Sequence, residues 1–176
     1  MVKDLLEPIS KMDGDSLPVS AFIDNPDGQF ETGASAYEKR GTAVTVPTWD
    51  PETCIQCNNC AFVCSHATIR PFLLSEDEVK AAPSNIKLAD TKPKAGEYKF
   101  AMSVSPLDCM GCGECITVCP KAADEAIKMV PQESQADEQP VFDYLVANVG
   151  KKDSGFADTT PKGSPVSYTH LRAHET

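Results

Sequence analysis

Apolar and polar positions alternate along several short stretches of the chain and predict β-strands there. The alternation is most regular over residues 98–104 (YKFAMSV), which predicts a strand with one buried face. Residues 44–46 (VTV) alternate in the same way and predict a shorter strand just before Trp49. The apolar runs at residues 17–22 (LPVSAF) and 126–130 (AIKMV) predict two more strands.

Two stretches carry helical patterns. Ser75 and Glu78 form the two ends of a capping box, so a short helix should follow and should end before Pro83. Further along, apolar residues recur at near-helical spacing over residues 141–149 (VFDYLVANV). This spacing predicts a small amphipathic helix that packs on another part of the protein. A short helix is also expected after Pro120.

Length and composition limit the classes of protein to consider. The chain has 176 residues, which suits one domain or two small ones, and its 14 prolines and 10 glycines predict much loop. A formal net charge of −10 leaves no basic face for nucleic acid and suits a soluble protein whose partner presents a basic surface. No apolar run approaches the ~20 residues of a transmembrane helix, and no secretory leader is present. We therefore expect a cytoplasmic protein that binds neither nucleic acid nor membranes.

The candidate chemistry lies in two cysteine runs, at residues 54–64 and 109–119, which both read C-x2-C-x2-C-x3-C and use all eight cysteines. Three cysteines at steps of three can surround one side of a cubane iron–sulfur cluster on a tight loop. In this type of run the fourth cysteine ligates the other cluster. We therefore assign one cluster to Cys54, Cys57, Cys60 and Cys119, and the other to Cys109, Cys112, Cys115 and Cys64.

Two other readings of the cysteines are open. Structural zinc usually takes two C-x2-C pairs, and a third cysteine at the next step of three, present in both runs, does not fit that plan. A disulfide framework would require an oxidising compartment, for which the chain shows no secretory leader. Two [4Fe–4S] clusters fit the doubled run better than either alternative.

The surroundings of the two runs also repeat. Pro51 and Pro106 each stand three residues before a first cysteine, which indicates an internal duplication whose halves are too small to bury a core alone. Ser65 follows the first run where Pro120 follows the second, and serine can cap the next turn instead. Gly111 and Gly113 should let the backbone approach the cluster and direct N–H groups at sulfur.

Three further expectations concern the module at residues 49–131. Trp49 should pack as core near a cluster rather than carry electrons. His66 should be a surface residue or lie just outside the ligands, because eight thiolates already fill both clusters. A module of this size has little apolar core, so without iron and sulfide it should be largely unfolded.

Several segments outside the cysteine runs resemble a known family. They are residues 17–22, 37–41 (YEKRG), 46–49, 69–74 (IRPFLL), 104–109 and 162–164 (KGS). Together they resemble the pyruvate:ferredoxin (flavodoxin) oxidoreductase family from about residue 17 to residue 164. The cysteine runs alone would indicate only a ferredoxin-like protein.

The resemblance implies a domain organisation. Residues 1–48 would be the end of an upstream domain and a connecting segment with the Glu-Lys-Arg run. Residues 49–131 would be a ferredoxin-like domain with two [4Fe–4S] clusters, and residues 132–165 a linker toward a missing thiamine-diphosphate domain. The expected fold is α+β: a bacterial two-cluster ferredoxin-like domain with an insertion at residues 71–97 between its halves, expected to cover one side of it. A small irregular β segment would precede this domain, and a loop-rich linker would follow it.

The resemblance also implies an activity for the longer parent enzyme. Pyruvate and coenzyme A would give acetyl-CoA and carbon dioxide, and electrons would pass to ferredoxin or flavodoxin. This chain would relay the electrons and would hold no catalytic residue, so alone it would be inactive. Thiamine diphosphate, magnesium and a third [4Fe–4S] cluster would lie in the missing parts, and the full-length form would be a homodimer. The alternatives are a stand-alone ferredoxin-type carrier and part of a pyruvate:NADP+ oxidoreductase.

The last residues, 166–176 (VSYTHLRAHET), resemble one reading frame of a transposase sequencing adapter. We expect them to be an artefact of library preparation and exclude them from fold reasoning. His170 and His174 are accordingly not taken as metal ligands.

Overall fold

The computed structural model describes residues 2–37, 39, 41–92, 98–150 and 152. The chain divides into two compact units, Met1–Gly41 and Thr42–Thr176. The second unit therefore begins before the expected domain boundary at residues 48 and 49, which falls inside a strand. The adapter-like residues, 166–176, lie outside the described residues.

The first unit consists of short helical turns. A π-helical turn, Val2–Leu6, continues into α1 (Glu7–Ser10), and 3-10 turns cover Gly14–Ser16, Val19–Phe22 and Ala34–Tyr37. The strand expected at residues 17–22 is therefore wrong, and of the β segment expected ahead of the ferredoxin-like domain only the strand at Thr45–Trp49 is present among the described residues. Val19 is 91% exposed, and the Pro18 carbonyl accepts the Ala21 N–H at 2.9 Å, so this stretch closes a turn instead of pairing with a strand.

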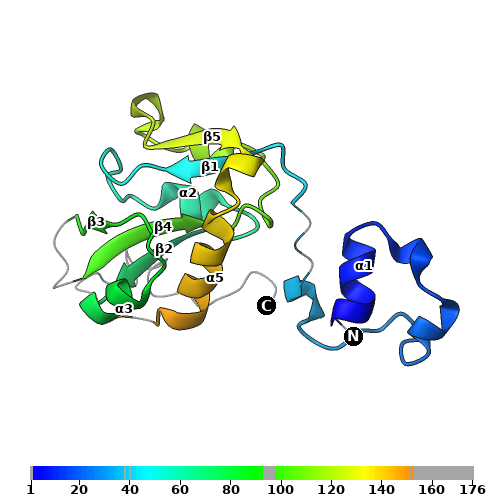
Figure 1. Ribbon diagram of the computed structural model, residues 1–176. Coiled ribbons are helices and arrows are strands. Elements are labelled where there is room, and N and C mark those ends of the chain that lie inside the picture. The colour runs from blue at the N-terminus through cyan, green and yellow to red at the C-terminus, as the bar shows by residue number, and fades with distance from the viewer. Residues whose placement is uncertain (1, 38, 40, 93–97, 151, 153–176) are drawn as a thin grey trace. The chain divides into compact units, whose positions relative to one another are not determined.

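Two antiparallel sheets form the second unit (Figure 1). In the first, β1 (Thr45–Trp49) pairs with β5 (Ile127–Pro131), with Trp49 opposite Ile127. In the second, β4 (Lys99–Val104) lies between β2 (Ile69–Leu74) and the short β3 (Ala89–Asp90). The strands expected near residues 44–46, 98–104 and 126–130 are confirmed. The strand at β2 was not predicted.

The internal duplication is visible in the order of these elements. Each half consists of a strand, a cysteine run with a short helix, and a second strand: β1, α2 (Asn59–Val63) and β2, then β4, α4 (Glu114–Thr117) and β5. Each sheet pairs a strand from one half with a strand from the other. Because the halves interlock in this way, the two cysteine runs are held close together, with α2 packed against α4.

The segment between the halves carries α3 (Glu76–Ala81) and β3. The predicted capping box is confirmed, since the Ser75 N–H donates to the Glu78 carboxylate at 2.8 Å and the Glu78 N–H donates to the Ser75 hydroxyl at 3.4 Å. Lys152 also donates to the Glu78 carboxylate, at 2.5 Å. These contacts fix the start of α3 beside β2.

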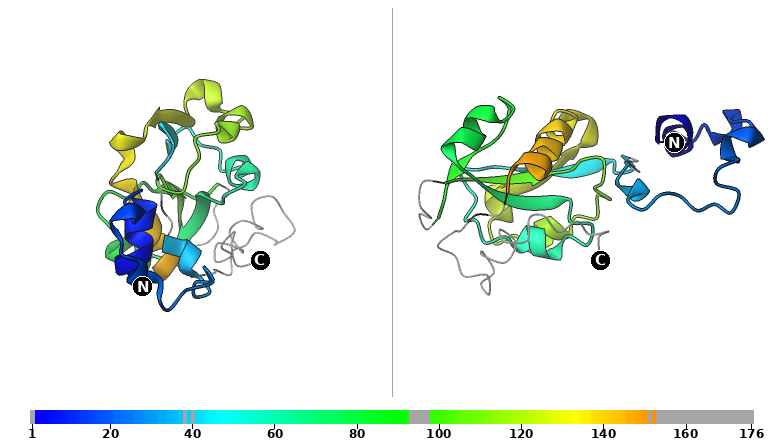
Figure 2. Two further views of the ribbon diagram at one scale, coloured as in Figure 1. Left: turned by 90° about the vertical axis from the view of Figure 1, so that its right-hand side faces the viewer. Right: turned by 90° about the horizontal axis from the view of Figure 1, so that it is seen from below.

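The predicted helix after the second half is confirmed as α5 (Glu138–Asn148). α5 and α2 lie on opposite faces of the β2–β4 pair (Figure 2). Phe72, Leu74 and Ala101 pack with α5 on one face, while Phe100 and Met102 pack on the cysteine side. Both faces of β4 are therefore buried, and the prediction of one buried face was wrong because α5 covers the other.

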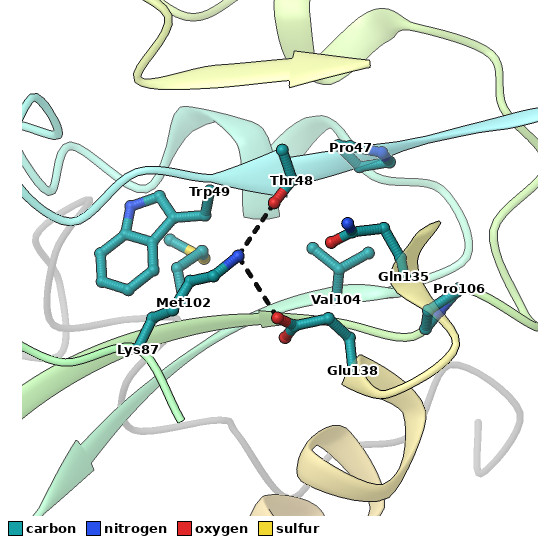
Figure 3. Close-up of a pocket in the computed structure, with 9 residues that line it drawn as sticks. All are labelled: Pro47, Thr48, Trp49, Lys87, Met102, Val104, Pro106, Gln135 and Glu138. Carbon is teal, nitrogen blue, oxygen red and sulfur yellow. Dashed lines mark hydrogen bonds and ion pairs between the residues drawn. The ribbon is translucent and has the colours of Figure 1, made fainter. Parts of the chain in front are cut away.

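Lys87, on the segment between the halves, contacts two of these elements at a small cavity (Figure 3). The Lys87 ammonium lies 3.0 Å from the Thr48 hydroxyl on β1 and 3.3 Å from the Glu138 carboxylate at the start of α5. The segment between the halves is thereby attached to β1 and α5.

Candidate metal centre

The eight cysteines surround two cavities, four to each. The first cavity is lined by four cysteines: Cys54, Cys57, Cys60 and Cys119. The second is lined by Cys64, Cys109, Cys112 and Cys115. Each cavity thus takes three cysteines from one run and the last cysteine of the other.

The sulfurs lie around these cavities without converging on one point. Among the described residues, no three His, Cys, Asp or Glu side chains come close enough together to hold a single metal ion. All eight thiols are free, so none is used in a disulfide. Thiolate donors spaced around a cavity are the arrangement that a cubane cluster requires, and the residues present fit two such clusters.

The short helices α2 and α4 each carry the third cysteine of a run. Cys60 lies on α2 and Cys115 on α4, and each helix begins after a residue in the left-handed region, Asn58 (φ 62°) and Gly113 (φ 78°). Their equivalent positions in the two runs are a further sign of duplication.

Backbone N–H groups point at cysteine sulfur in both runs. The Gly111 N–H donates to Cys109 Sγ at 3.4 Å, as expected, and the Gln56 N–H donates to Cys54 Sγ at 3.3 Å. Gly111 and Gln56 occupy equivalent positions and both have positive φ, 68° and 59°. A non-glycine residue pays for this conformation with about 1–2 kcal/mol of strain.

Gln56 is held in that conformation by its side chain, which is buried. Its Nε2 donates to the Asp90 carbonyl at 2.7 Å, and its Oε1 accepts the Lys92 N–H at 2.7 Å. The segment between the halves thus anchors the first cysteine loop. The sequence analysis missed Gln56, although it holds the same position in the first cysteine run as Gly111 holds in the second, and this could have identified it.

Burial and mutual repulsion both disfavour thiolates at these sites. Burial, the largest cause, and the nearby Cys54, Cys57 and Cys115 together raise the pKa of the Cys60 thiol to about 12. Burial raises the pKa of Cys115 to about 11 in the same way. Because α2, which carries Cys60, packs against α4, which carries Cys115, the two cavities are neighbours. Four thiolates gathered around one cavity therefore need a positively charged centre among them.

Other residues singled out from the sequence also lie at these cavities. Trp49 lines the first cavity and is 4% exposed, with its ring edge against Phe100 at a centroid distance of 5.9 Å. This confirms its expected packing in the core beside the cysteines. His66 lines the second cavity but is exposed to solvent, and its ring contacts the Ser65 hydroxyl at 3.2 Å.

Thr68 is the other residue that the sequence analysis missed. It is buried beside the second cavity, and its hydroxyl lies 3.2 Å from Cys64 Sγ. No pattern in the sequence marks it; its counterpart in the second half is Ala126, the residue directly before β5.

The fold and the paired cysteine cavities are those of a two-cluster ferredoxin-type protein. Consistent with this, a family model described as a 4Fe-4S dicluster domain matches residues 53–123. A second model, EKR, described as a domain of unknown function, matches residues 1–43.

Curated relatives extend the match to nearly the whole chain. It is 48% identical to the pyruvate-flavodoxin oxidoreductase of Klebsiella pneumoniae and 44% identical to the pyruvate:ferredoxin oxidoreductase of Moorella thermoacetica, in each case over 93% of this chain. It is also 44% identical over 93% of its length to the pyruvate dehydrogenase [NADP(+)] of Cryptosporidium parvum. The chain belongs to the pyruvate:ferredoxin (flavodoxin) oxidoreductase family.

The chain spans only 14% of the first and second of these relatives and 8% of the third. It thus corresponds to a small segment of an oxidoreductase. Within the described residues, no helix is both long enough and apolar enough to span a membrane.

Proposed function

We propose that this chain is an electron relay that holds two adjacent [4Fe–4S] clusters by ligands exchanged between its halves. The first cluster would be bound by Cys54, Cys57, Cys60 and Cys119, and the second by Cys109, Cys112, Cys115 and Cys64. The single observation that carries the proposal is that the last cysteine of each run lies in the cavity of the other run.

When bound, such clusters accept and release one electron at a time. The chain's own residues keep the two centres close, exclude water and direct hydrogen bonds at sulfur. Interlocked sheets fix the distance between the cavities, Trp49 and Ile127 cover the first of them, and the N–H groups of Gln56 and Gly111 stabilise negative charge on cysteine sulfur.

The parent activity that we infer is the oxidative decarboxylation of pyruvate with coenzyme A to acetyl-CoA and carbon dioxide. Ferredoxin or flavodoxin would accept the electrons, as the names of two relatives indicate. Thiamine diphosphate, magnesium and a third [4Fe–4S] cluster would belong to other parts of the enzyme. This chain would have no catalytic residue and would be inactive alone. A cytoplasmic location and a homodimeric full-length form belong to the same proposal.

In this reading, residues 1–48 end an upstream domain and include the connecting segment, and residues 49–131 bind the clusters. Residues 132–165 lead toward the next domain. Within the last stretch, α5 packs on the β2–β4 sheet, so its first part is also a cover for the cluster module.

The matches that extend beyond the cysteine runs favour the relay over a stand-alone carrier, because relatives align over 93% of the chain. A carrier would need neither the EKR-matching residues 1–43 nor α5. The NADP+-linked form is the second candidate, because one relative carries that name.

Anaerobic reconstitution of the chain with iron and sulfide tests the proposal. We expect about eight irons and eight sulfides per chain, a brown charge-transfer absorption, and a paramagnetic signal on reduction. Two tightly bound zinc ions, or a colourless protein, would overturn it.

A further inference from the structure

We propose that Thr68 tunes the second cluster by donating hydrogen bonds to the sulfur of Cys64, and that this raises the cluster's reduction potential relative to a module without them. The inference rests on the proposed function, because it requires a cluster bound by Cys64 and the Cys109 run. Thr68 binds no iron itself and acts only through the ligand sulfur.

Two donors of Thr68 meet the same sulfur. The hydroxyl oxygen lies 3.2 Å from Cys64 Sγ, and the backbone nitrogen donates to it at 3.4 Å. A cysteine that ligates iron has no proton to give, so the hydroxyl must then be the donor.

The surrounding structure fixes the position of Thr68. Ala67, just before it, has a φ of 50°, and its N–H donates to the Cys64 carbonyl at 3.0 Å, which closes a tight turn. Arg70 Nε donates to the Ala67 carbonyl at 2.8 Å, and the Ser105 N–H donates to the Thr68 carbonyl at 2.8 Å. Thr68 is only 2% exposed, so water does not compete strongly for its hydroxyl.

A second attachment connects this turn to α5. Gln139, buried on α5, accepts hydrogen bonds from the Ser105 hydroxyl at 2.9 Å and from the Leu107 N–H at 3.1 Å. The same loop carries the Ser105 N–H that holds Thr68. The position of the hydroxyl is therefore set by both halves of the module and by α5.

The duplication makes this feature asymmetric. Thr68 directly precedes β2 and its carbonyl accepts the Ser105 N–H; the equivalent residue directly before β5 is Ala126, whose carbonyl accepts the Asp50 N–H and whose side chain has no hydroxyl. The second cluster therefore receives a hydroxyl hydrogen bond from this position, and the first does not. Because reduction adds negative charge to the cluster, hydrogen bonds to its sulfurs favour the reduced state and raise the potential.

The test compares Thr68→Val with Thr68→Ser in the reconstituted chain. Valine has nearly the shape of threonine but no hydroxyl, while serine keeps it. Redox titration is followed by the paramagnetically shifted signals of the cysteine β-CH₂ protons, which report each cluster separately. We expect Thr68→Val to lower the potential of the second cluster only, and Thr68→Ser to stay close to the wild type. Thr68→Ala, the residue that the second half uses, should shift the potential like valine.

Iron content is measured first and separates the two proposals. If the wild type fails to bind about eight irons, the proposed function fails and this inference with it. If the clusters load and Thr68→Val and Thr68→Ala leave the second potential unchanged, shift both clusters equally, or match Thr68→Ser, the inference is wrong.

Discussion

Replacing Gly111 with alanine tests how closely the second cysteine loop approaches β1. Gly111 has a φ of 68°, and a Cβ built on it would lie 2.9 Å from the Thr45 carbonyl oxygen and 3.2 Å from Ala43 Cβ. Real Cβ atoms essentially never approach backbone that closely, so either β1 or the loop would have to move. Gly113 is a matched control in the same loop, because its φ of 78° is similar and no atom lies within 4 Å of its Cβ position.

The destabilisation of the two alanine variants should differ only by the clash that the new Cβ makes at Gly111. Left-handed backbone costs an alanine about 1–2 kcal/mol in either position. Overpacking against a held backbone adds about 1–3 kcal/mol at Gly111. Since 1.36 kcal/mol corresponds to a factor of about ten in rate, 1–3 kcal/mol means that Gly111→Ala should lose the second cluster roughly 5 to 160 times faster than Gly113→Ala.

The assay is the first-order bleaching of the charge-transfer absorption in anaerobic urea, with the β-CH₂ signals showing which cluster is lost. Equal rates for the two variants would refute the reasoning, because the close approach of Gly111 to Thr45 would then have no energetic consequence. Faster loss from Gly113→Ala would refute it more strongly.

Two further predictions concern the segment between the halves. Gln56→Ala should speed loss of the first cluster, because it removes two side-chain hydrogen bonds of about 1 kcal/mol each. Gln56→Gly should be less destabilising than Gln56→Ala by about 1 kcal/mol, because glycine relieves the left-handed strain. Faster cluster loss from the glycine variant than from the alanine variant would contradict this. Hydrogen bonds from Lys152 and Ser75 outweigh burial and lower the pKa of Glu78. Its stabilisation should therefore be present above the unfolded-state pKa of about 4.3 and be lost as the pH falls through the lower folded-state value. The thermal midpoints of wild type and Glu78→Gln should accordingly differ by the equivalent of about 1 kcal/mol at pH 7 and converge in acid. A difference in midpoint that does not change with pH would show that ionisation of the Glu78 carboxylate does not contribute this stability.

Local signals predicted much of the fold and the whole set of candidate ligands. The spacing of the cysteines depends on short loops whose geometry is set within a few residues, and the quartets formed by Cys119 and Cys64 with the opposite runs are found at the two cavities. The capping box at Ser75 and the helix at residues 138–148 likewise depend on local pattern.

What the sequence did not show depends on contacts between distant segments. The strand at residues 69–74 is buried on both faces, so it has no alternation to detect. The strand expected at residues 17–22 has an apolar pattern but no partner strand in the described part of its unit. Gln56 and Thr68 are ordinary polar residues, and their roles appear only when Asp90 and Cys64 are brought beside them.

The exchange of ligands between the halves is tested most directly by the pair Cys119→Ser and Cys64→Ser in the reconstituted chain. The account predicts that Cys119→Ser perturbs the signals and iron content of the cluster held by the Cys54 run, and that Cys64→Ser perturbs the cluster held by the Cys109 run. If Cys119→Ser instead damaged the Cys109 cluster and left the Cys54 cluster intact, each run would serve its own cluster and the account would be contradicted.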